Sequence, residues 1–85
     1  MNITYRLNNN ILYIALDGRV DAANAQEVEK KIFEIKDAHP NTHTVIDADN
    51  LAYISSAGLR IILRLKKADA NLAIINVVPE VYDVF

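Results

Sequence analysis

Two helix-length amphipathic segments alternate with short apolar segments of strand length, and this alternation limits the possible folds most strongly. The apolar residues of the first helical segment, residues 22–37, recur on one face: Ala25, Val28, Ile32 and Ile35. Residues 56–68 also favour a helix, and strand-like segments flank both helical segments. A helix between two strands forms a crossover, which pairs strands in parallel. The expected fold class is therefore α/β, a small mixed β-sheet with helices packed on it.

The pattern of apolar residues predicts four strands. They are residues 3–7, 11–16, 44–48 and 72–77. The asparagines at 8–10 predict a hairpin turn, because asparagine tolerates the left-handed backbone conformation. Residues 17–21 and 49–54 are expected to be connections. The predicted element order is β-β-α-β-α-β-α, with the last helix beginning near Val78.

The second helical segment has a predicted face for the sheet and a predicted face for solvent. The residues expected to face the sheet are Leu59, Ile62 and Leu63. The charged residues that recur at i, i+4 and i+7 and mark the solvent face are Arg60, Arg64 and Lys67. Ile61 and Leu65 lie between these faces, and we expect both to be partly exposed.

The composition excludes several classes of function. The chain has 85 residues, enough for one domain, and it contains no cysteine, which excludes a disulfide scaffold, a thiolate metal site and a cysteine nucleophile. A net charge of −2 does not favour nucleic acid or an anionic membrane as the main partner. No apolar stretch approaches the roughly 20 residues that span a bilayer. The first ten residues lack the pattern of a signal peptide, so we expect a cytoplasmic protein.

Residues 1–85 are expected to form a single domain that is incomplete at its C-terminal end. The sequence stops about two turns into the predicted last helix. At that point Val81, Val84 and Phe85 would have no surface on which to pack.

The sequence does not predict an enzyme. Ser56 has no evident general base, because His39 and His43 both belong to the region before the third strand and the pattern G-x-S-x-G is absent. Pro40 prevents a continuous helix that would bring the two histidines together as metal ligands. A Walker loop and a GxGxxG pattern are also missing. We therefore predict no catalytic residue, no metal site and no cofactor.

Ser55 and Ser56 stand where the chain passes from an apolar segment into the second helix. A serine there can cap the helix, which is worth about 1 kcal/mol, as Asp21 is expected to cap the first helix. A phosphorylated serine would instead gain about −1.5 to −2 charges at the surface. Position alone favours capping, and a regulatory phosphate stays open as the second interpretation.

Three segments, in the right order, resemble the STAS domain family, the fold of bacterial anti-sigma factor antagonists. Residues 45–63 read VIDADNLAYISSAGLRIIL and are similar to the family's signature around its serine. Residues 16–29 are similar to the family's glycine–aspartate–helix motif, and residues 75–85 to its strand, proline and third-helix start. The positions that fit the serine signature are Asp47, Leu51, Ile54, Ser56, Gly58 and Leu59.

The resemblance implies a protein-binding switch. In this family the unmodified antagonist binds an anti-sigma factor, usually also a serine kinase that uses ATP, and thereby frees a sigma factor. The kinase phosphorylates the antagonist, which then no longer binds, and a phosphatase restores it. Carried over to this chain, Ser56 is the phosphoacceptor, with Ser55 as the alternative. Asp21 would lie near Ser56 on the partner-facing edge.

The residues predicted to contact the partner are Asp21, Ser55, Ser56, Gly58, Arg60, Ile61 and Arg64. Gly58 would allow close approach of another backbone, Ile61 would add apolar contact, and the arginines would make contacts at the rim. Many phosphorylated members carry an aspartate where this chain has Ser55. A second hypothesis therefore stays open, an unphosphorylated STAS module that serves as a regulatory or scaffold part of a larger protein or transport complex.

Overall fold

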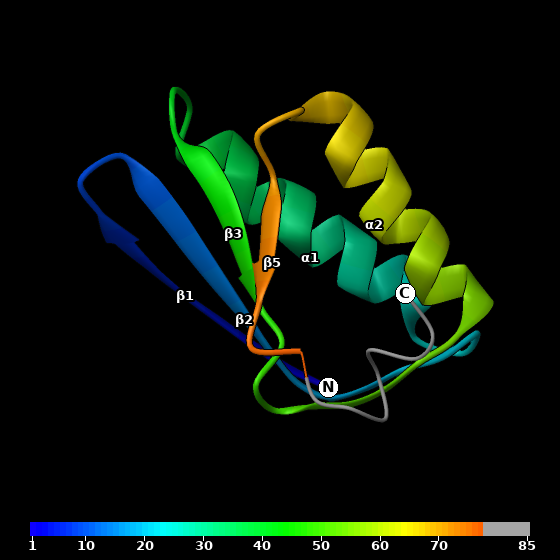
Figure 1. Ribbon diagram of the computed structural model, residues 1–85. Coiled ribbons are helices and arrows are strands. Elements are labelled where there is room, and N and C mark those ends of the chain that lie inside the picture. The colour runs from blue at the N-terminus through cyan, green and yellow to red at the C-terminus, as the bar shows by residue number, and fades with distance from the viewer. Residues whose placement is uncertain (78–85) are drawn as a thin grey trace.

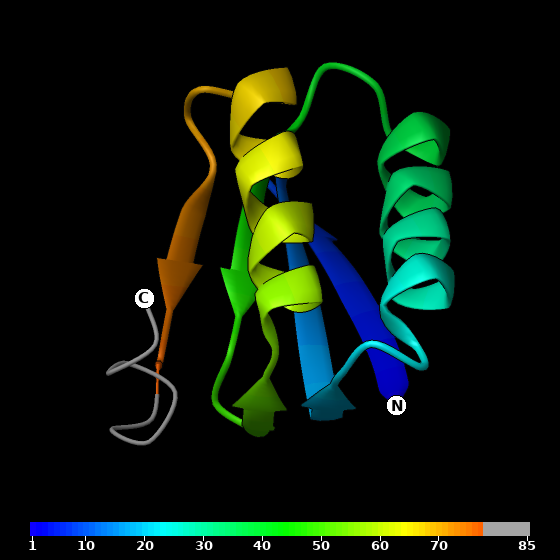
Figure 2. The same cartoon turned by 90° about the vertical axis from the view of Figure 1, so that its right-hand side faces the viewer.

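The computed structural model describes residues 1–77 as one β-sheet with two helices on the same face (Figures 1 and 2). The elements are β1 (Asn2–Asn8), β2 (Ile11–Val20), α1 (Ala25–Ala38), β3 (His43–Asp47), β4 (Leu51–Ile54), α2 (Ser56–Ala68) and β5 (Ala73–Ile75). The mixed α/β fold expected from the sequence is confirmed. Neither described helix has the length and apolar character that a bilayer crossing requires. The predicted third helix lies outside the described residues.

β2 is the strand that organises the sheet. It pairs antiparallel with β1 along the whole of β1, and the hairpin turn contains Asn9 and Asn10 at φ 51° and 68°. Two positive φ angles are typical of the type I′ turn, whose twist matches that of the strands, so the predicted turn is confirmed. The first half of β2 pairs in parallel with β3, which pairs in parallel with β5, and the last residues of β2 pair in parallel with β4.

Two segments that were predicted as connections are strands. Residues 17–20 continue β2, with a bulge between Gly18 and Arg19 and a φ of 118° at Gly18, a conformation that glycine adopts readily. Residues 51–54 form β4, which pairs with this extension. The predicted order therefore lacked one strand. The reason is that only the two ends of β4 are buried, so its four residues do not alternate as a half-buried strand does.

The hydrophobic core lies between the sheet and the two helices. The residues that α1 buries are the four that its periodicity predicted, Ala25, Val28, Ile32 and Ile35. β2 contributes Leu12, Ile14 and Leu16, none of which is more than 2% exposed. The helix itself begins at Ala25, three residues later than predicted, because residues 21–24 form a turn.

α2 has the predicted bounds but a different buried face. Its buried residues are Gly58, Ile61 and Leu65, whereas Leu63 is 62% exposed. The expectations that Ile61 and Leu65 are partly exposed and that Leu63 faces the sheet are therefore wrong. Because Gly58 has no side chain, this side of the helix approaches the strands closely, and residues one and two turns further on follow it into the core. Leu59 and Ile62, also predicted to face the sheet, are half-buried.

Candidate functional site

β2 and β4 end side by side, and the residues that follow them bring Asp21 and the two serines to one end of the sheet. Val20 pairs with Ile54, and the N–H of Ser55 donates to the carbonyl of Val20 over 2.8 Å. Both helices also begin at this end, which lies at the bottom of Figure 2. We call Asp21, Ser55 and Ser56 the serine end. The register agrees with the expectation that Asp21 lies near Ser56.

Ser55 is the N-cap of α2. Its backbone is extended, with φ −87° and ψ 174°, and its Oγ accepts a hydrogen bond from the N–H of Gly58 over 3.2 Å. Its carbonyl accepts from the N–H of Leu59 over 2.9 Å. Amide groups in the first turn of a helix have no partner within the helix, so this cap stabilises the start of α2. The capping interpretation is confirmed for Ser55.

Ser56 is the first residue of α2 and is exposed. Within residues 1–77, the hydrogen bonds at this junction run to Ser55 and not to the hydroxyl of Ser56. The adjacent serines therefore differ in what they do. One holds the helix start in place, and the other presents a free hydroxyl at the surface, where a modifying enzyme could reach it.

Asp21 orders the turn that leads into α1. Its Oδ1 accepts from the N–H of Ala23 over 2.9 Å and from that of Asn24 over 3.1 Å. In return the N–H of Asp21 donates to Oδ1 of Asn24 over 2.9 Å. The N-cap position of α1 belongs to Asn24, so the prediction that Asp21 is the cap is corrected. These bonds hold the half-buried Asp21 in a fixed position at the serine end.

Gly58 and Ile61, both predicted to contact a partner, are buried inside the domain. Ile61 is 2% exposed. A Cβ added at Gly58 would lie 2.6 Å from Cγ1 of Ile54 and 2.9 Å from Cγ1 of Val20. The close approach that Gly58 permits is therefore made to the strands of its own domain. Neither residue offers a side-chain surface to a partner.

The two arginines of α2 that were predicted to contact a partner differ in their surroundings. Arg64 forms an ion pair with Glu29, which joins α2 to α1. The hydrogen bond that Nε of Arg64 donates to this carboxylate raises the pKa of Arg64. Arg60 is exposed and lies one turn from Ser56 along α2. Of the two, Arg60 is the one placed beside the serine end.

An exposed pair beside the serine end was not found from the sequence. The guanidinium carbon of Arg19 lies 4.4 Å from the ring centroid of Tyr53, which is 40% exposed. These residues are neighbours in the register of β2 and β4. If residues 51–54 had been assigned to a strand, the contact between Arg19 and Tyr53 could have been predicted, because residues opposite each other in a sheet contact.

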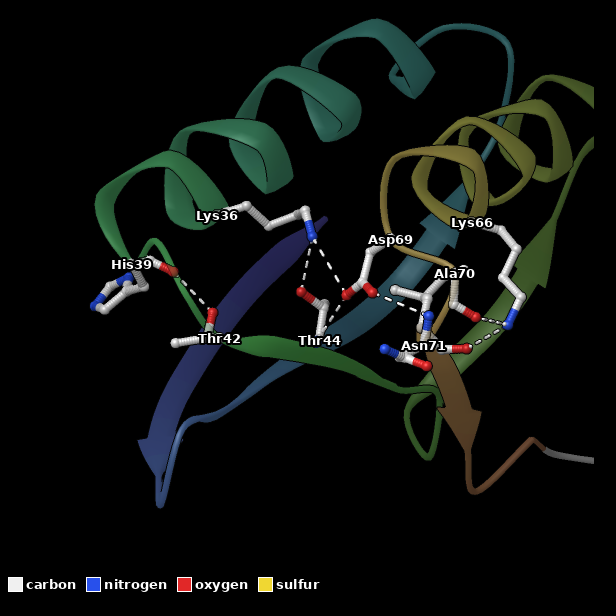
Figure 3. A network of polar contacts seen from close by, with 9 residues as sticks. Lys36, His39, Thr42, Thr44, Lys66, Asp69, Ala70 and Asn71 are labelled. Carbon is white, nitrogen blue, oxygen red and sulfur yellow. Dashed lines mark hydrogen bonds and ion pairs between the residues drawn. The ribbon is translucent and has the colours of Figure 1, made fainter.

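The opposite end of the domain holds a network of polar contacts, which Figure 3 shows in close view. Nζ of Lys36 donates to Oγ1 of Thr44 over 2.9 Å and lies 4.0 Å from Oδ2 of Asp69. The carboxylate of Asp69 accepts from the backbone N–H of Thr44 over 3.3 Å and from that of Asn71 over 3.0 Å. We call Lys36, Thr44, Asp69 and Asn71 the Asp69 network.

The Asp69 network favours the charged form of its carboxyl group. Burial by itself would raise the pKa of Asp69. The backbone hydrogen bonds from Asn71 and Thr44, together with the charges of Lys36 and His43, outweigh burial, so the pKa of Asp69 is lowered. Within residues 1–77 no group of three or more acidic or histidine side chains is arranged to hold a metal ion.

The sequence matches known proteins over its whole length. Residues 2–85 match the family model of the STAS domain. The chain is 33% identical over 89 residues to BtrV of Bordetella bronchiseptica, which is named as an anti-sigma factor antagonist, and the match covers 100% of this chain and 76% of BtrV.

Solved structures share the fold. A Thermotoga maritima protein named as an anti-sigma factor antagonist has a TM-score of 0.86 and 15% identity, covering 96% of this chain and 74% of that one. The anti-sigma factor antagonist SpoIIAA of Bacillus has 22% identity in two structures, each covering 99% of this chain. Its unphosphorylated form has a TM-score of 0.75 with 77% of SpoIIAA covered, and its phosphorylated form a TM-score of 0.67 with 80% covered.

At these identities the solved structures are evidence of the fold alone. The family model covers nearly every residue, and the match to BtrV covers the whole of this chain. The chain belongs to the STAS domain family.

Proposed function

We propose that this chain is an anti-sigma factor antagonist, a non-enzymatic switch of the cytoplasm that is controlled by phosphorylation of Ser56. The unmodified form binds an anti-sigma factor, and the phosphorylated form is released. The observation that carries the proposal is the difference between the two serines, since Ser55 caps α2 while Ser56 is exposed. The names of the relatives support it, because BtrV and SpoIIAA are both named as anti-sigma factor antagonists and SpoIIAA is known in unphosphorylated and phosphorylated forms.

A phosphate on Ser56 can act without remodelling the domain. The bond that caps α2 runs from the N–H of Gly58 to Ser55, so modification of Ser56 leaves it intact. The new charge stands at the surface, where an incoming partner would have to remove water from it or place its own charges beside it. Either effect weakens docking, and removal of the phosphate restores it.

The partner we propose is an anti-sigma factor that is also a serine kinase using ATP, with a phosphatase as the second partner. The docking surface surrounds Ser56 and includes the ordered Asp21 and the exposed Arg60. The Arg19–Tyr53 pair lies on the adjoining strands, one register position before Val20 and Ile54. Tyrosine and arginine are among the residues that most often dominate binding energies in protein interfaces, so this pair extends the surface beyond the residues predicted from sequence.

The direct test incubates the chain and its variants Ser56→Ala and Ser55→Ala with ATP and a lysate of the host. Each sample is captured, its phosphorylated positions are identified by mass spectrometry, and co-purifying proteins are identified. We expect phosphate on Ser56 in the unmodified sequence and in Ser55→Ala, and none in Ser56→Ala. An ATP-binding kinase should be retained best by Ser56→Ala.

Circular dichroism of both variants is the control for folding, because loss of the Ser55 cap weakens α2. Absence of phosphate from both serines, with a transporter or scaffold component captured in place of a kinase, would contradict the proposal. That result would favour the unphosphorylated STAS module.

A further inference from the structure

Ser56 and Arg60 lie one turn apart on the exposed surface of α2. The helix is continuous from Ser56 to Ala68, and both residues are exposed. Side chains four residues apart on a helix are neighbours, with Cβ atoms about 5–6 Å apart. An anion at the first position and a cation at the second is also the more favourable order along a helix.

Among the residues that the structure describes, Arg60 is a cation of α2 that takes part in no ion pair. The ion pairs within residues 1–77 join Lys36 to Asp69 and Arg64 to Glu29, and neither involves Arg60. The first turn of α2 contains no acidic residue that would compete for its guanidinium. Arg64 is eight residues from Ser56, about 12 Å along the helix axis, and is already paired.

Two charged groups near Ser56, those of Asp21 and Arg19, have partners of their own. Oδ1 of Asp21 accepts backbone hydrogen bonds from its own turn, and the guanidinium of Arg19 lies over the ring of Tyr53.

We propose that a phosphate on Ser56 forms an ion pair with Arg60 along the surface of α2. The planar guanidinium can donate two parallel hydrogen bonds to phosphate oxygens, which makes arginine better suited to this contact than lysine. The inference rests on the proposed function, since it takes Ser56 as the phosphoacceptor, and it deepens that function by naming the regulatory residue. Phosphorylation would then change two groups of the docking surface, adding an anion at Ser56 and withdrawing the cation of Arg60 from a partner.

The test uses the full chain with phosphoserine installed directly at position 56. Phosphorus NMR follows the second ionisation of the phosphate, ordinarily near pH 6, in the otherwise unmodified sequence and in Arg60→Gln, Arg60→Lys and Arg64→Gln. A neighbouring cation favours the dianion and lowers its pKa. We expect this pKa to be about 0.3 pH units lower with Arg60 than in Arg60→Gln. Arg60→Lys should keep part of the shift, and Arg64→Gln should keep all of it.

Equal phosphate pKa values with Arg60 and in Arg60→Gln would overturn the inference, as would an equal effect of Arg64→Gln. A thermal melt of each protein with and without the phosphate gives a second readout, because the ion pair should make phosphorylation raise Tm more when Arg60 is present. The phosphate is installed without a kinase. A failure of the lysate experiment to find phosphate on Ser56 would therefore count against the proposed function and leave this titration unaffected.

Discussion

The two ends of the domain use their polar side chains in opposite ways. In the Asp69 network the side chains of Lys36, Thr44 and Asp69 bond to other parts of the fold, and Thr44 is 0% exposed. At the serine end, Ser55 and Asp21 satisfy the backbone groups of the turns, whereas Ser56 stays exposed. We infer that polar groups bonded within the fold contribute stability, and that those left at the surface are available to a partner.

The two ends of the domain are far enough apart for their roles to be tested separately. α2 starts at the serine end and leads into Asp69, and its 13 residues extend about 20 Å. Substitutions so far apart, with no shared contacts, usually have independent effects. Stability and partner binding should therefore respond to different residues, and the following changes are ordered by the size of the expected effect.

The largest loss of stability is expected from a substitution in α2, the helix that joins the two ends. Ile61→Ala should lower the free energy of unfolding by about 2–5 kcal/mol, because it leaves a cavity under α2. Leu63→Ala, two residues away on the exposed face, should change it by no more than about 0.5 kcal/mol. Urea unfolding measures both. Similar losses for the two variants would mean that the buried face of α2 has been assigned wrongly.

Asp69→Ala should lower the free energy of unfolding by about 2 kcal/mol, because the N–H of Thr44 and the ammonium of Lys36 lose an acceptor in a half-buried place. The exposed Asp49→Ala is the matched control and should stay within about 0.5 kcal/mol. Chemical denaturation gives both values, and a pull-down of the partner should be unaffected by either change. Weakened binding by a stably folded Asp69→Ala would show that the two ends are coupled.

Substitutions of the two adjacent serines should differ in how much they destabilise the domain. Ser55→Ala removes the N-cap and should cost about 1 kcal/mol, seen as a lower midpoint of thermal unfolding. Ser56→Ala removes an exposed hydroxyl and should change stability by less than about 0.5 kcal/mol. If Ser56→Ala proved the more destabilising of the two, the assignment of the cap to Ser55 would be wrong.

The smallest expected effect is a dependence of stability on pH at the Asp69 network. Because folding lowers the pKa of Asp69, its charged form stabilises the folded state at any pH above its unfolded pKa, near 3.8. That contribution is lost as the pH falls through the lower pKa of the folded state. Asp69→Asn should thus be less stable at pH 7 by a few tenths of a kcal/mol, and the difference should shrink below about pH 4. A difference that stays constant or grows in acid would contradict the lowered pKa.

Local patterns predicted much of the fold correctly. The asparagines form the expected turn at φ 51° and 68°, the buried face of α1 follows its apolar period, and α2 begins at the serine pair. These features depend on neighbouring residues, so the sequence contains the relevant information. The position of Asp21 beside the serines was implied by the family resemblance, and the pairing of β2 with β4 agrees with it.

The features that were missed depend on contacts between distant residues. β4 was missed because its burial depends on α2 and on the extension of β2. The sequence of its four residues alone does not indicate these contacts. The buried face of α2 is set by the contact of Gly58 with Val20 and Ile54, and the periodicity of the helix alone did not indicate it. The Arg19–Tyr53 pair joins two strands whose pairing was not predicted.

Control of binding by a phosphate on Ser56 can be measured by calorimetric titration of a purified anti-sigma factor, without ATP. The titration is done with the unmodified chain and with the chain carrying phosphoserine at 56. Asp69→Asn serves as the control at the opposite end. We predict that the phosphate weakens binding by at least about 30-fold, while Asp69→Asn binds as the unmodified chain does. Equal affinities of the unmodified and phosphorylated chains would contradict the proposed switch and leave Ser56 as an exposed helix residue without a switching role.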